Sequence, residues 1–88
     1  MNEFEKQLNE KLQNKNFNTK EISSIIGDIF ISTIFKNYKI NNFYIQSEKT
    51  SFENILLLNI ISEEKTIVEI MISKNDDLTI KEVLTTIY

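Results

Sequence analysis

Carboxylates are the most distinctive reactive side chains of this sequence, because most other groups that do chemistry in proteins are missing. The 88 residues include 13 acids and 10 lysines, but no His, Cys, Arg, Trp or Pro. The chain therefore lacks the commonest general base, the thiolate nucleophile and the bidentate guanidinium fork. A single glycine also excludes a phosphate-cradling loop. We expect a protein that is not an enzyme and that holds no cofactor and no metal.

The acidic residues gather in the second half of the chain. Residues 1–44 carry six lysines and five acids (+1), whereas residues 45–88 carry four lysines and eight acids (−4). Such a surface repels nucleic acid and attracts basic protein surfaces. The candidate partner-binding carboxylates are Glu48, Glu53, Glu63, Glu64, Glu69, Asp76 and Asp77. The ordinary alternative is a solvated acidic face that keeps the protein in solution.

The segment 35–46 has the opposite character, with two lysines, no acid and several aromatic residues. Aromatic rings beside lysines can stack on and bind single-stranded bases. Lys36, Tyr38, Lys39 and Tyr44 are therefore candidate nucleic-acid contacts. Two lysines release few counterions, so we expect nucleic acid to be an unlikely partner. The alternative is that the aromatic side chains belong to the core.

Two helices are predicted in the first half of the chain. Apolar residues recur every four positions over residues 3–15, and a longer helical pattern covers residues 19–36. Asn18 followed by Glu21 predicts the N-cap of this second helix. Gly27 indicates either a close crossing inside a continuous helix or a helix end, after which residues 29–35 would form a strand.

Three strands and a last helix are predicted in the second half. Residues 42–48 alternate between apolar and polar, residues 52–61 are apolar on both faces, and residues 66–73 follow after a turn at 62–65. A strand that is buried on both sides lies in the middle of a sheet. A second capping pattern, Thr79 with Glu82, and apolar residues at helical spacing predict a helix to the C-terminus.

These elements predict one α+β domain over residues 1–88, in the order α-α-β-β-β-α. The three strands form an antiparallel meander packed against the long central helix. The α-β-β-β-α portion resembles the topology of double-stranded-RNA-binding domains. Lys81 stands alone among acids at the start of the last predicted helix, so the lysine cluster of those domains has no counterpart here.

The second face of the predicted sheet is the other candidate site. Its apolar residues are Leu57, Ile61, Ile67 and Met71. Either the shorter helices cover these residues, or they form an exposed patch for a second copy or a different protein. The outer strands of the meander also leave edges open for pairing.

Together these features predict a small acidic protein-binding module that is not an enzyme. We expect a stoichiometric inhibitor of a larger protein, such as a nucleic-acid-handling enzyme, in phage–host conflict; size and charge alone resemble those of anti-CRISPR and immunity proteins. A self-associating scaffold that pairs through its sheet, as a homodimer for instance, is the alternative, and a weak single-stranded nucleic-acid binder is the third. No signal peptide or membrane-spanning run is visible, which predicts a cytoplasmic protein that does not bind membranes.

Overall fold

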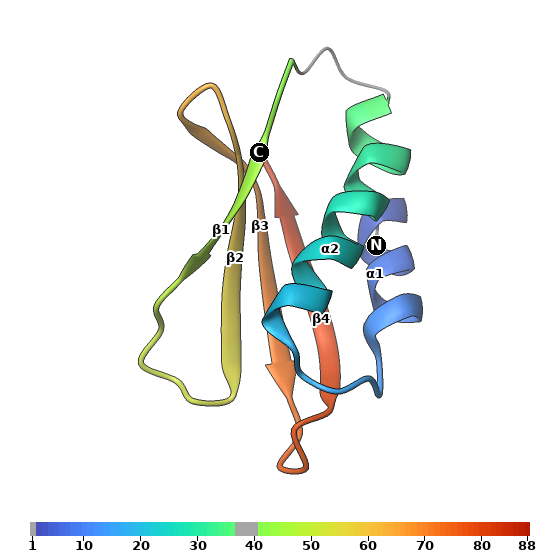
Figure 1. Cartoon of the computed structure of the whole chain (residues 1–88), viewed down its shortest axis with the longest axis vertical. Helices are drawn as coiled ribbons and strands as arrows, with labels where there is room; N and C mark the ends of the chain where they lie inside the picture. Colours follow the sequence, from blue (N-terminus) through green and yellow to red (C-terminus); the bar gives the residue numbers. More distant parts are fainter. Residues whose placement is uncertain (1, 37–40) are drawn as a thin grey trace.

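The computed structural model describes residues 2–36 and 41–88 (Figure 1). The elements, in chain order, are α1 (Glu3–Leu12), α2 (Thr19–Phe30), a π-helical turn η1 (Ile31–Phe35), β1 (Tyr44–Glu48), β2 (Ile55–Ser62), β3 (Lys65–Lys74) and β4 (Ile80–Ile87). The strands form one antiparallel sheet in the order β1-β2-β3-β4. The predicted α+β class is confirmed, with a four-stranded meander in place of the predicted three strands.

The last predicted helix is wrong, because residues 80–87 form the edge strand β4. Thr79 does not cap a helix; its backbone N–H and its hydroxyl donate to the carboxylate of Asp77, at 3.1 and 2.6 Å. The hydroxyl bond is the main cause that lowers the pKa of Asp77. β-Branched residues are frequent in this segment, and β3 offers it a hydrogen-bonding partner along its length. The resemblance to double-stranded-RNA-binding domains disappears with that helix.

The two N-terminal helices form where the sequence predicts them. The side chain of Asn18 accepts the N–H of Glu21 at 3.2 Å, which confirms the predicted N-cap. The first helix ends at Leu12, earlier than the predicted Lys15, because Asn14 takes a left-handed conformation with φ of 69°. Residues 29–35 are helical, so the alternative of a strand there is wrong.

Gly27 lies inside α2 without breaking the helix. A Cβ atom at this position would meet only the Cδ1 atom of Ile45, at 3.8 Å, which is an ordinary van der Waals contact. Alanine has the higher helix propensity and restricts the unfolded chain. We expect Gly27→Ala to raise the free energy of unfolding by about 0.5–1 kcal/mol, measured by urea denaturation. A loss of stability would show that α2 needs glycine to cross β1.

The π-helical turn brings aromatic residues together in the core. Bonding of the i→i+5 type places Phe35 beside Phe30, with ring centroids 6.2 Å apart. Phe43 packs on both rings, at 4.7 Å from Phe30 and 5.5 Å from Phe35. Phe30 is therefore buried in the core, and the partly buried rings of Phe35 and Phe43 pack against it.

Both helices lie on the same face of the sheet, and the core fills the space between the two layers (Figure 1). The inward side chains of the central strands are fully buried: Leu58, Ile60, Val68, Ile70 and Ile72. This alternation agrees with the predicted inward faces of β2 and β3, although Ile67, predicted on the other face, also packs against the core. No described helix covers the other face of the sheet, which we call the open face.

Helix α1 closes the β4 edge of the sheet with its side chains. The amide of Asn9 pairs with the backbone of Val83 as a strand would, accepting its N–H at 3.0 Å and donating to its C=O at 2.9 Å. The Glu5 carboxylate accepts the N–H of Thr85 at 2.6 Å and its hydroxyl at 3.1 Å. The α1–α2 linker adds backbone hydrogen bonds to the start of β4. Within the described residues, this leaves β1 as the edge strand without such cover.

Across the described part of the chain, no helix combines the length and the apolar character that crossing a bilayer requires.

Candidate functional site

The open face presents three rows of side chains that run across the strands. Residues that are directly opposite in an antiparallel sheet point to the same face, so the strand register defines these rows. One row is aliphatic, the middle row is polar, and the third is aromatic and aliphatic. The first row contains Leu57, Met71 and Leu84 and ends in Glu48 on β1. The middle row contains Gln46, Asn59, Glu69 and Thr86. The third row contains Tyr44, Ile61 and Thr66.

A shallow hollow of about 380 Å³ lies on this face, lined by Glu48, Asn59, Thr66, Glu69 and Tyr88. The amide of Asn59 donates to the Glu48 carboxylate at 3.2 Å and orients it. No described lysine forms an ion pair with either glutamate. The hollow therefore presents two carboxylates whose charge no described side chain neutralises.

Exposed apolar side chains frame the hollow. Tyr44 and Tyr88 are 57% and 72% exposed, and Leu84 is 44% exposed. Leu57 and Met71 are half-buried between them. Tyrosine is enriched among the residues that dominate binding energy in protein interfaces, and such interfaces combine an apolar centre with polar groups. The open face thus has the composition of a protein-binding surface.

The structure separates the predicted apolar site residues. Leu57 and Met71 lie on the open face, and Ile61 is there too, although its neighbours bury it. Ile67 packs against the core instead. The cause is an irregular register: Val68 pairs with Ile60 and Thr66 pairs with Ile61, so Ile67 has no residue opposite.

The predicted acidic residues also divide between the face and its rim. Glu48 and Glu69 lie on the open face, and the others lie in connections at the two ends of the sheet. The β1–β2 loop holds Glu53, the β2–β3 turn holds Glu63 and Glu64, and the β3–β4 turn holds Asp76 and Asp77. Glu63 and Glu64 have positive φ, which is the conformation of a two-residue hairpin turn and confirms the turn predicted there.

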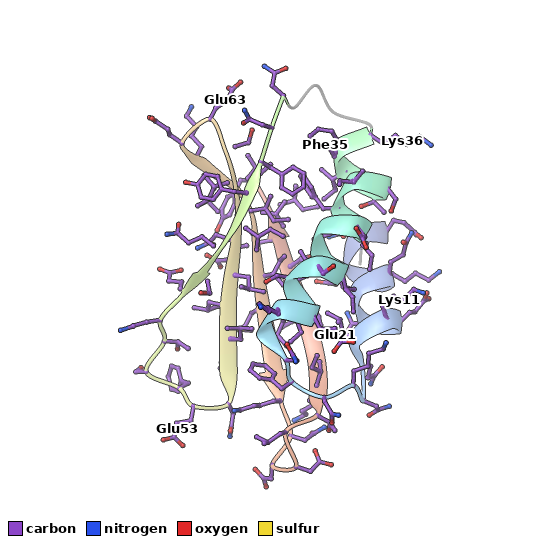
Figure 2. All side chains as sticks on the ribbon, viewed as in Figure 1. Lys11, Glu21, Phe35, Lys36, Glu53 and Glu63 are labelled. Atoms are coloured by element: carbon purple, nitrogen blue, oxygen red, sulfur yellow. The ribbon has the colours of Figure 1, made fainter. Side chains whose placement is uncertain are left out.

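The two candidate nucleic-acid residues within the described part of the chain, Lys36 and Tyr44, do not share one surface. Lys36 follows the helical layer and extends away from the sheet (Figure 2). Tyr44 lies on the open face, on the other side of the sheet. Tyr38 and Lys39 lie outside the described residues.

Sequence reasoning missed the contribution of β4 to the open face. Leu84, Thr86 and Tyr88 extend the rows, and Glu82 pairs with Ser73 at their end. The alternation of Val83, Thr85 and Ile87 was the signal for a strand. The apolar residues of the same segment also fit helical spacing, which led to the prediction of a helix.

The described residues contain no group of three or more acidic, His or Cys side chains that could hold a metal ion. Comparison of the chain with family models, with curated proteins and with solved structures finds no match.

Proposed function

We propose that this protein is a non-enzymatic binding module whose open face docks on a basic surface of a larger protein. The observation that carries the proposal is the hollow with Glu48 and Glu69, unpaired with any described lysine and framed by tyrosines and aliphatic side chains. A partner's lysine or arginine placed between the two carboxylates would neutralise them, while the frame supplies apolar contact and excludes water.

Charge favours a basic partner over a second copy on this face. Packing two open faces against each other brings Glu48 and Glu69 of both copies into one interface, and close like charges cost several kcal/mol when water is excluded. A basic surface gains from the same glutamates, and its association with the module is faster.

Occupation of such a surface would inhibit its normal activity by a one-to-one block. Surfaces that bind nucleic acid are basic because they neutralise phosphates, so carboxylates compete directly for them. This is the basis on which we extend the proposal to a stoichiometric inhibitor of a nucleic-acid-handling protein, including one that acts in phage–host conflict.

Site-specific photo-crosslinking tests which layer meets a partner. A photoreactive phenylalanine analogue replaces Tyr88 on the open face or, as the control, Ile31, an exposed apolar residue of the helical layer. Each variant is irradiated in lysate of the source organism, with and without nuclease treatment. We expect a discrete protein adduct from position 88 alone, with a basic segment at the crosslinked site.

Adducts that form equally at both positions would contradict a defined binding face. An adduct with a second copy would replace the proposed function by self-association. Capture that disappears after nuclease treatment would replace it by nucleic-acid binding.

Neutralising the hollow should slow binding of the recovered partner. We expect E48Q/E69Q to lower the association rate constant at least tenfold at low salt and to flatten its dependence on ionic strength. The control, E10Q/D28N, changes net charge equally at exposed positions of the helical layer. Surface plasmon resonance at several salt concentrations measures the association rate constants of both variants. Equal effects of the two variants would show that net charge, and not the position of the hollow, determines the rate.

A further inference from the structure

The free edge of β1 offers main-chain hydrogen-bonding groups beside the proposed binding face. Val83 directs both its N–H and its C=O away from β3, toward Asn9. The N–H and C=O groups of successive residues in an antiparallel strand point alternately to its two neighbouring strands. The direction at Val83 therefore fixes the direction at each paired residue of β3, β2 and β1. It places the N–H and C=O groups of Ile45 and Ser47 at the outer edge of β1. Within the described residues, nothing bonds to them there.

The two edges of the sheet are therefore unequal. Side chains of α1 and the linker occupy the bonding groups of β4, and β1 has no equivalent cover. An uncovered edge strand is a template for an added strand, which gains affinity from main-chain bonds and selectivity from alternate side chains.

The negative charge around β1 favours a positively charged segment as the added strand. Residues 41–64, which contain β1 and β2, carry four glutamates and one lysine, a net charge of −3. Glu53 and Glu63 lie at opposite ends of this ribbon (Figure 2), and Glu48 lies on β1 itself. A second copy would bring −3 beside −3, so a basic segment fits this edge better.

We propose that an extended, lysine- or arginine-rich segment of the partner pairs with β1 as a fifth strand of the sheet. This inference rests on the proposed function and adds the mode of docking to it. Alternate side chains of the added strand would lie beside Tyr44, Gln46 and Glu48 on the open face. The cationic ones among them would extend toward the hollow.

A defined peptide tests the pairing. The probe has nine residues, lysine alternating with valine and threonine, and capped ends. Two matched probes carry N-methyl groups on alternate amides or glutamate in place of lysine. We expect the basic probe alone to slow hydrogen exchange of the Ile45 and Ser47 amides, followed by NMR. N-methylation should weaken binding at least tenfold, because the charge remains while the strand bonds are lost.

A variant of the protein gives the complementary test. Ser47→Pro removes one outward N–H at an exposed edge position, where proline is tolerated, and it leaves the β1–β2 ladder intact. Ser47→Ala keeps that N–H and is the control. We expect the proline variant to bind the basic probe at least tenfold more weakly and the alanine variant to bind within twofold of wild type, with circular dichroism confirming that both fold.

The outcomes separate this inference from the proposed function. Equal binding of the basic and N-methylated probes, sensitive to E48Q/E69Q, would overturn strand addition and leave docking on the open face intact. No binding of the basic probe at millimolar concentration would overturn strand addition too. Protection of the same amides by dimerisation of the protein alone would assign the edge to a second copy.

Discussion

Replacing Phe30 by alanine is expected to lower the free energy of unfolding by about 3–5 kcal/mol. The ring is fully buried and packs edge-on against Phe4, at 6.0 Å, and against Phe43, at 4.7 Å. Its removal leaves a cavity where the helices meet the sheet. A domain of this length has about 4–13 kcal/mol in total, so much of its stability depends on this one side chain.

Urea denaturation followed by circular dichroism measures the effect, and Phe52→Ala is the matched control. Phe52 is the same residue type, but it is 66% exposed in the β1–β2 loop. We expect its replacement to change stability by less than about 0.5 kcal/mol. Similar losses for both variants would mean that Phe30 does not join the two layers of the core.

Replacing Asn9 by alanine is expected to cost about 2–4 kcal/mol, because it leaves the N–H and the C=O of Val83 without partners. The same amide nitrogen also donates to the C=O of Glu5, at 2.9 Å. Alanine has the better helix propensity, so any loss of stability reflects the hydrogen bonds of the Asn9 side chain, two of which go to β4. Asn9→Asp keeps the acceptor for the Val83 N–H and loses the donor, and it should fall between wild type and Asn9→Ala.

Gln7→Ala is the control for this helix, since the Gln7 amide bonds only to the nearby Glu3 carboxylate at the surface. Equilibrium unfolding of the purified variants compares them, and hydrogen exchange of the Val83 amide reports the edge directly. We expect faster exchange in Asn9→Ala alone. Unchanged stability together with unchanged exchange would rule out α1 as the closure of the β4 edge.

Local patterns in the sequence predict much of this fold. Helical spacing and the Asn18 cap locate both helices, and the alternation around Ile45 and through residues 55–61 locates two strands with the correct inward faces. The Glu63-Glu64 turn follows from its length between two apolar runs. These features depend on neighbouring residues, whose periodicity is visible in the chain.

The candidate site was predictable only in part. Leu57 and Met71 were identified from strand alternation, and Glu48 and Glu69 from the charge distribution. The structure places all four on the open face. Ile67 was expected on the open face but packs against the core. A one-residue irregularity in the pairing of β2 with β3 turns its side chain to the other face. Such an irregularity depends on how two strands pair, so the sequence of one strand does not reveal it.

Residues 79–87 show where local patterns stop being sufficient. Ile80, Val83 and Leu84 satisfy helical spacing, while Val83, Thr85 and Ile87 satisfy strand alternation. The choice depends on distant groups: β3 supplies bonds along one edge, and Asn9 and Glu5 supply them along the other. Tertiary bonding partners outweigh a weak local preference.

Composition and periodicity by themselves therefore determined the absence of His and Cys chemistry, the α+β class, the two helices and the apolar strands. Only the tertiary structure decided that a fourth strand completes the sheet, that both helices share one face, and that one edge is closed while β1 stays open. The physical reason is that burial and backbone pairing depend on which distant segments meet. That arrangement also creates the acidic hollow, because its lining residues come from β1, β2, β3 and the C-terminus.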